Sequence, residues 1–163
     1  MITPIIRRAE NRDIPALLEL LGQVLNIHNE GRPDIFRTPE AGHTLVKYTA
    51  PELEEMLKDE KHVILAADIG GKVSGYAFCE LKQLMDDNIF TPIKTMYIDD
   101  ICVDASARGA RVGTALYAAV KELAVSLGCH NITLRVWEFN EAAVSFYEKM
   151  GMRTQARIME EVL

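Results

Sequence analysis

Residues 94–137 constrain the fold most strongly, because they alternate between strand and helix patterns on either side of a turn of small residues. An apolar run over 94–103 predicts a strand, 104–110 predicts a loop, and a β-rich run over 131–137 predicts a second strand. The helix between them is predicted by an apolar stripe and a terminal glycine, namely Val112, Leu116, Ala119, Leu123, Leu127 and Gly128. Such a unit forms a right-handed crossover between parallel strands.

The segments before this unit predict further strands and helices. Residues 2–8 predict an opening strand, and an apolar stripe from Ile14 to Leu25 predicts a helix capped by Asn11 or Asp13. Residues 30–49 predict a long irregular loop, and Pro51 opens a second short helix. The apolar runs over 63–69 and 73–81, joined at Gly70-Gly71, predict an antiparallel hairpin.

After the crossover, Asn140 predicts the cap of a last helix that ends at Gly151, and residues 152–162 predict a closing strand. The expected fold is therefore α/β, with a single mixed, largely antiparallel sheet flanked by helices around a central parallel β-α-β crossover. A length of 163 residues predicts one domain over 1–163. An open final strand in so small a sheet favours a homodimer, because edge strands are usually covered.

Composition and charge narrow the classes of partner. An apolar fraction of 48% and a net charge of −6 are typical of a globular protein and argue against nucleic acid or anionic membrane as a partner. No apolar run is long enough for a bilayer, and the N-terminal residues lack the order of a signal peptide. Three cysteines without metal-ligand spacing predict free thiols, no metal and a cytoplasmic protein.

The turn between the first strand and the helix of the crossover favours an anion. The first N–H groups of a helix lack intrahelical partners, and the helix dipole is positive at that end. Gly109 and Gly113 let the backbone approach a ligand, while Arg108 and Arg111 add positive charge. These features suit a pyrophosphate. The same residues also fit a tight turn with solvated arginines, and the turn alone does not decide between the two.

A second segment decides in favour of binding. The order Asn140, Ala143, Phe146-Tyr147 and Gly151-Met152 follows the next strand. Together with Arg108-Gly109-Ala110-Arg111-Val112-Gly113, it resembles the two signatures of the GNAT superfamily of acyl-CoA-dependent N-acetyltransferases. The similarity covers residues 63–162, whereas residues 1–60 match a variable acceptor-side region in outline only. The chain departs from the family at Arg111, where the first signature usually has its central glycine.

The resemblance implies acetyl-CoA as cosubstrate and assigns residues to it. The strand residues Ile101, Cys102 and Val103 would line the pantetheine arm, with backbone groups of Ile101 and Val103 pairing with it like an added strand. The pyrophosphate would be held by the amides of the turn and the helix start, namely Arg108, Gly109, Ala110, Arg111, Val112, Gly113 and Thr114. Asn140 would fix the cofactor arm or the gap between the two parallel strands.

The resemblance also implies the catalytic groups. Tyr147 would donate a proton to the departing CoA thiolate, although a Phe-Tyr pair on a helix also fits plain packing. The acceptor amine, with a pKa near 10.4, must lose a proton before it attacks. Asp99 is the expected base, and only one of Asp99 and Asp100 is expected to face the acceptor, because successive strand residues point to opposite faces. His28, His43 and Glu138 are alternatives.

The predicted function is transfer of an acetyl group from acetyl-CoA to a primary amine of a small molecule or peptide, within a ternary complex. The acceptor region, residues 1–60, is expected to use Leu25, His28, Phe36 and Tyr48 together with Asp99, while residues 61–163 bind acetyl-CoA. Trp137 would lie in the same cleft or at a partner interface. Two alternatives are a non-catalytic acyl-CoA-binding regulatory module and a nucleotide-binding domain. The second lacks the lysine that a phosphate loop needs before Gly113-Thr114.

Overall fold

The computed structural model describes residues 3–42 and 44–163, and it contains one five-stranded sheet. The strands follow the chain order, as β1 (Ile5–Arg8), β2 (His62–Ile69), β3 (Lys72–Gln83), β4 (Lys94–Val103) and β5 (Asn131–Leu134). Neighbouring strands are antiparallel except for β4 and β5, which are parallel. The predicted fold class and its central parallel crossover are confirmed. The start of the predicted opening strand, at residue 2, lies outside the described residues.

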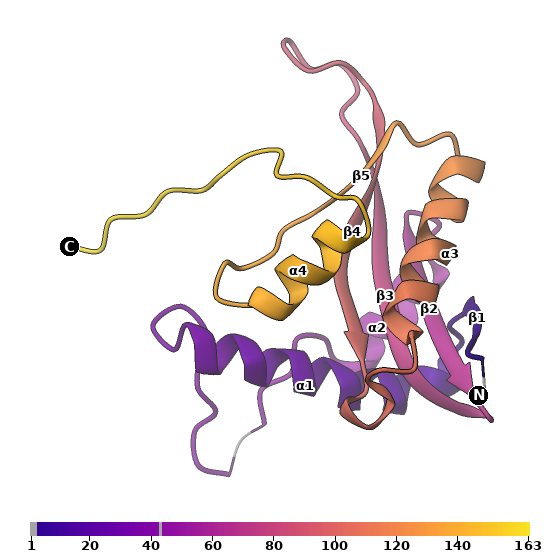
Figure 1. The fold of residues 1–163 in the computed structure, drawn as a ribbon, viewed down its shortest axis with the longest axis vertical. Coiled ribbons are helices and arrows are strands. Elements are labelled where there is room, and N and C mark those ends of the chain that lie inside the picture. The colour runs from indigo at the N-terminus through magenta and orange to yellow at the C-terminus, as the bar shows by residue number, and fades with distance from the viewer. Residues whose placement is uncertain (1–2, 43) are drawn as a thin grey trace.

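Helices cover both faces of the sheet and build two apolar cores. One core joins α1 (Ile14–Gly31) and α2 (Ala50–Lys58) to one face, through Leu17, Leu20, Leu53 and Tyr76 among others. The other joins α3 (Val112–Ser126) to the opposite face, through Val63, Met96, Ile98 and Leu116 among others. The last helix, α4 (Glu141–Lys149), contributes Phe146 and the following Met150 to the edge of the α3 core. Figure 1 shows α4 beside β4 and β5, away from β1.

The two parallel strands separate soon after they meet. β4 pairs with β5 only from Thr95 opposite Asn131 to Ile98 opposite Leu134. Beyond Ile98, β4 continues to Val103, while the chain after Leu134 leaves the sheet. The second half of β4 therefore has a free edge on the side where β5 would have continued. β5 is also shorter than its predicted range of 131–137.

The predicted closing strand over 152–162 is wrong for this chain. Residues 152–163 carry no regular secondary structure, and Figure 1 shows them leaving α4 as an extended trace that runs away from the sheet. A strand requires a neighbour for its N–H and C=O groups. Among residues 3–42 and 44–163, no strand lies beside this tail. Four of its apolar side chains are accordingly exposed, namely Ile158, Met159, Val162 and Leu163.

The start of α2 and the free cysteines agree with what the sequence predicts. α2 begins at a capping box in which Thr49 and Glu52 exchange hydrogen bonds, and α1 runs six residues beyond Leu25, to Gly31. Cys79 and Cys102 are buried, Cys129 is half-buried, and all three are free. Within residues 3–42 and 44–163, no helix is both long and apolar enough to cross a membrane. The same residues contain no cluster of three or more His, Cys, Asp or Glu side chains that could hold a metal ion.

Candidate active site

The free edge of β4 presents the backbone of Ile101 and Val103. The Asp104 amide donates to the Ser74 carbonyl of β3 over 2.9 Å. Counting back along β4 from Asp104, successive residues therefore direct their backbone N–H and C=O groups alternately toward β3 and away from it. Cys102, opposite Tyr76, therefore directs its N–H and C=O groups toward β3, whereas those of Ile101 and Val103 point away from it. An extended ligand arm can bind to these open groups as an added strand does.

Cys102 does not share this exposure. Its side chain is buried against α1, where the Sγ atom donates to the Leu20 carbonyl over 3.5 Å. Burial raises the pKa of its thiol to about 12, with a further contribution from Asp100. Because its backbone groups face β3 and its side chain faces α1, Cys102 offers nothing to a ligand on the open edge. It belongs to the core.

The turn after β4 ends at the N-terminus of α3 and offers unpaired amides. Ala105–Ala107 form a short 3₁₀ turn, and Ala110 donates to the Ala107 carbonyl. Within the described chain, the turn amides of Arg108, Gly109 and Arg111 have no backbone acceptor. The first amides of α3, from Val112 to Thr114, lack intrahelical acceptors as in any helix. These amides and two exposed arginines form a site suited to a phosphate group.

Arg111 occupies a backbone conformation that favours glycine. Its φ of 58° and ψ of 21° lie in the left-handed region, and it is the residue that caps α3. This conformation explains why glycine suits the position, since an L side chain costs about 1–2 kcal/mol there. The Arg111 side chain is exposed, so the strain is confined to the backbone.

Gly113 lies where α3 meets α4 and β4. A Cβ atom built there would lie 3.4 Å from the Phe146 ring and 3.6 Å from the Val103 side chain, which are ordinary van der Waals contacts. A methyl group would therefore fit at this position, whereas a longer side chain would meet its neighbours. Its amide remains at the helix start, where it is open to an anion.

A β-bulge brings Asp99 and Asp100 to one side of β4. Phe78 of β3 pairs with Asp100 and Cys79 pairs with Ile98, so Asp99 is the extra residue. Met96 and Ile98 lie in the α3 core before the bulge, and Ile101 and Val103 pack against that core after it. The bulge thereby shifts by one residue the alternation of β4 side chains between the two faces of the sheet. The prediction that only one of the two aspartates faces the acceptor side is wrong, because it assumed a regular strand.

The two carboxylates share one cation and differ in their surroundings. The Lys47 Nζ atom lies 2.9 Å from Asp99 Oδ2 and 3.8 Å from Asp100 Oδ2. The Tyr48 hydroxyl donates to Asp99 over 2.9 Å, and the Tyr76 hydroxyl donates to Asp100 over 3.0 Å. The Asp99 side chain is 31% exposed and that of Asp100 only 11%. Burial raises the pKa of Asp100, and the charge of Lys47 opposes that rise in part.

Tyr147 lies close enough to Asp100 to respond to its charge. Burial is the main cause of the raised pKa of the Tyr147 phenol, and the Asp100 carboxylate adds to it. The phenol therefore remains protonated at neutral pH and is able to donate a proton. The Asn140 side chain caps α4, accepting from the Ala143 amide over 3.2 Å, and so fixes the helix that carries Tyr147.

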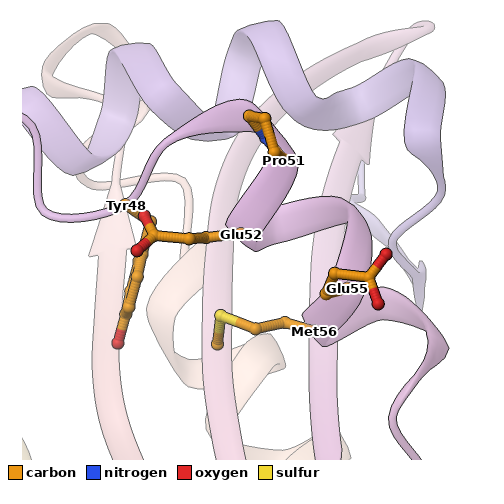
Figure 2. Close-up of a pocket in the computed structure, with 5 residues that line it drawn as sticks. All are labelled: Tyr48, Pro51, Glu52, Glu55 and Met56. Carbon is orange, nitrogen blue, oxygen red and sulfur yellow. The ribbon is translucent and has the colours of Figure 1, made fainter.

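A pocket beside α2 leads toward these carboxylates. It has a volume of about 420 Å³ and is lined by Tyr48, Pro51, Glu52, Glu55 and Met56. Figure 2 shows the Tyr48 ring and the Met56 side chain pointing to the same side of α2. A smaller hollow of about 60 Å³ shares Tyr48 and Met56 and extends to Asp99. The path from solvent to Asp99 is thus lined by an aromatic ring, a thioether and acidic side chains, a combination that suits an amine with an apolar stem.

Aromatic side chains form a cluster where the end of α1 meets the chain after β5. The His28 and Phe36 rings stack at 4.8 Å, Phe36 meets Trp137 at 5.3 Å, and Trp137 stacks on Phe139 at 5.8 Å. Burial lowers the pKa of His28, and the Lys47 charge lowers it further, so His28 is neutral at pH 7. The structure thus joins the predicted residues His28 and Phe36 in one cluster. Leu25 lies half-buried one turn before His28 on α1.

Neither of the other two candidate bases, Glu138 and His43, is placed beside the carboxylate pair by the structure. Glu138 is exposed between β5 and α4, and His43 lies outside the described residues. Lys47 and Tyr76 were not anticipated from the sequence. Lys47 lies in an irregular loop without periodicity, and Tyr76 lies in a buried strand, so only the folded chain brings both to the carboxylates.

Several known proteins are similar to this chain. The model of the acetyltransferase (GNAT) family matches residues 23–152. Glucosamine 6-phosphate N-acetyltransferase of Trypanosoma brucei brucei is 40% identical over 63 residues, which span 39% of this chain and 41% of that relative. Thialysine N-epsilon-acetyltransferase of Sus scrofa is 33% identical over 60 residues, spanning 37% of this chain and 35% of that relative.

One solved structure resembles nearly the whole chain. A variant of the BH1408 protein from Bacillus halodurans is 31% identical, with a TM-score of 0.90 over 98% of this chain and 99% of that one. The match to the curated relatives, in contrast, covers less than half of their length. The architecture that this chain shares with the BH1408 protein therefore covers more of the chain than the segment that aligns with the curated relatives.

Proposed function

Because this chain belongs to the acetyltransferase (GNAT) family, we propose that it transfers an acetyl group from acetyl-CoA to a primary amine. The observation that carries the proposal is the open edge of β4, which continues directly into a turn of unpaired amides at the start of α3. Ile101 and Val103 would pair with the pantetheine arm, and the amides from Arg108 to Thr114 would hold the pyrophosphate. This assigns residues 61–163 to the cofactor and residues 1–60 to the acceptor.

The proposed reaction is direct attack in a ternary complex. A carboxylate takes a proton from the ammonium, and the neutral amine attacks the thioester carbonyl. The oxyanion is met by a backbone N–H near Ile101, and Tyr147 donates a proton to the CoA thiolate. Asp99 was the base expected from the sequence, and it remains a candidate. We assign the base to Asp100, because burial raises the pKa of its carboxyl and strengthens it as a proton acceptor, and ammonium binding to Asp99, because it is the nearer carboxylate to the Lys47 ammonium.

The proposed acceptor is a cationic alkylamine, either a small molecule or a peptide. The approach to Asp99 contains Glu52 and Glu55, which would attract an ammonium and repel a phosphate. The curated relatives are named for both an ε-amine and an amino sugar phosphate, so the preference for an alkylamine rests on the acidic approach to Asp99. The aromatic cluster of His28, Phe36, Trp137 and Phe139 would contact the apolar part of the acceptor.

An amine screen tests the proposal. Purified protein is incubated with acetyl-CoA and alkylamines of graded length, and free CoA is measured by a thiol reagent. Tyr147→Phe serves as the variant that retains the fold. Turnover with at least one amine that falls in this variant supports catalysis. Acetyl-CoA binding without acetylation of any amine would favour the non-catalytic regulatory module.

We further propose that the protein is a cytoplasmic homodimer in which the C-terminal tails are exchanged. β5 lies at the end of the sheet and pairs on one side only, with β4. The tail of residues 152–163 is extended, and its Ile158 and Met159 side chains are 76% and 86% exposed. An open edge strand and an unpaired extended segment complement each other in a symmetric dimer. Free thiols are consistent with a reducing compartment.

A further inference from the structure

The Lys47 ammonium lies where the proposed mechanism requires the ammonium of the acceptor. It is 2.9 Å from Asp99 Oδ2 and 3.8 Å from Asp100 Oδ2, so it bridges the two carboxylates. Its side chain is 34% exposed and extends from the irregular loop between α1 and α2. The ion pair between Lys47 and Asp99, whose side chains are 34% and 31% exposed, contributes little to folding stability. Stability alone is therefore a weak reason for this arrangement.

Lysine is itself a primary alkylamine of the class proposed as acceptor. The neighbours of Lys47 are those that an incoming amine would meet, because Tyr48 donates to the same Asp99 oxygen and the Lys47 charge lowers the pKa of His28. Asp100, the proposed base, lies 3.8 Å from the Lys47 ammonium, and its charge also contributes to the raised pKa of Tyr147. The chain thus holds one of its own amines beside the proposed base and the proposed ammonium site.

From this placement we infer that Lys47 is a site of self-acetylation, with acetyl-CoA as the donor. The inference rests on the proposed function, because it uses the same cofactor and the same catalytic groups. Proximity makes the reaction intramolecular once acetyl-CoA is bound, and this favours Lys47 over lysines that meet acetyl-CoA only by diffusion.

The proposed step balances without any further reactant. Asp100 takes one proton from the Lys47 ammonium, and the neutral Nζ atom attacks the thioester carbonyl carbon. A C–N bond forms, the C–S bond breaks, and Tyr147 donates its proton to the CoA thiolate. The second proton lost from Nζ restores Tyr147, and Asp100 releases its proton to solvent. The products are Nε-acetyl-Lys47, CoA and one proton.

The reaction has a consequence for the acceptor site. An acetylated Lys47 is neutral and cannot pair with Asp99, and its acetamide would remain in the space used by the acceptor. An external amine must displace the Lys47 ammonium from the same carboxylates. Acceptor amines should therefore slow acetylation of Lys47, and Lys47 acetylation should slow turnover of those amines.

The test is a time course of the full chain with acetyl-CoA, followed by intact mass and by peptide mapping of each lysine. Lys58 and Lys72 are internal controls, since their side chains are 63% and 70% exposed and both are more available to chemical acetylation than Lys47. We expect Lys47 to be acetylated at least about tenfold faster than either, with a rate independent of protein concentration. Tyr147→Phe should slow Lys47 and leave Lys58 unchanged.

Two further measurements keep the outcomes distinct. Lys47→Arg keeps the positive charge but provides no nucleophile, so it should bind acetyl-CoA normally and lose the fast modification. Acetylation of Lys47 at the rate of Lys58 and Lys72, in a protein that still acetylates an external amine, would overturn the inference and leave the proposed function intact. Absence of acetyl-CoA binding by calorimetry would overturn both.

Discussion

Asp99 and Asp100 are consecutive in β4, and yet both carboxylates lie within 4 Å of the same Lys47 ammonium, at 2.9 Å and 3.8 Å. The bulge at Asp99 produces this relationship, because Asp99 is an extra residue of β4 between the pairs that Ile98 and Asp100 form with β3. The pair has a buried member and a more exposed member, and burial raises the pKa of the buried one. These different surroundings are the basis for the different roles proposed for two identical side chains.

The first prediction separates those roles by matched substitutions. Asp100→Asn removes the proposed base and should lower kcat by roughly 10²-fold or more, with little change in the KM for the amine. Asp99→Asn removes the proposed ammonium site and should mainly raise that KM. Steady-state kinetics with one amine measures both effects. The reverse pattern would return the base to Asp99.

A second prediction concerns pH and Asp100. Its pKa is raised in the folded state, so the protonated form is favoured there, and the associated stability is present at low pH and lost as the pH rises through the folded pKa. Asp100→Asn imitates the protonated form. It should therefore increase the free energy of unfolding at neutral pH, and this gain should shrink as the pH falls below the ordinary aspartate pKa of about 3.9. Urea unfolding across that range checks the sign, and a variant less stable than wild type at pH 7 would contradict it.

Tyr147→Phe forms the third prediction. Loss of the proton donor should lower kcat by roughly 10²-fold while acetyl-CoA affinity stays within a few-fold of wild type. Tyr117→Phe is the matched control, because Tyr117 is also a buried tyrosine with a raised pKa and lies on α3 in the core. Equal losses in both variants would indicate a packing effect. Because the Tyr147 pKa is raised, no alkaline loss of activity from this group is expected near neutral pH.

The fourth prediction uses the left-handed backbone of Arg111. Arg111→Gly should stabilise the fold by about 1 kcal/mol, because glycine adopts this conformation without strain. It should also weaken CoA binding by about tenfold if the guanidinium pairs with phosphate. Thermal unfolding and calorimetry measure the two effects separately. Tighter CoA binding would show instead that the arginine crowds the turn.

The exchanged tail gives the fifth prediction. Removal of residues 153–163 should convert a dimer into a monomer, and Ile158→Lys should weaken the dimer while leaving the tail in place. Light scattering after size exclusion, at micromolar concentrations, reports the mass. A full-length protein that is monomeric, or a truncated protein that is still dimeric, would contradict tail exchange.

The sequence predicts most elements of the fold because its periodic patterns and caps are local. Gly70-Gly71 marks the hairpin, Gly128 ends α3, and Asn140 caps α4, each through the chemistry of its own residue. Prediction failed where the outcome depends on a neighbour. The tail was predicted as a closing strand, but in the part of the chain that the structure describes it has no strand to pair with.

The candidate site was predicted in part for the same reason. The turn from Arg108 to Gly113 and Tyr147 were recognised because they belong to contiguous motifs. The shared orientation of Asp99 and Asp100 depends on a bulge, and the bulge depends on how β4 pairs with Phe78 and Cys79 of β3. Lys47 reaches the carboxylates from a loop that has no periodic signal, so only the folded structure places it there.

The central claim is that the turn before α3 binds the pyrophosphate of CoA. Calorimetry with CoA and acetyl-CoA tests it on wild type, on Arg108→Glu and on Lys121→Glu, which changes the charge equally on an exposed position of α3. The account predicts binding by wild type and Lys121→Glu, and a loss of about 100-fold or more in Arg108→Glu. Absence of binding by wild type, or equal binding by all three proteins, would contradict it.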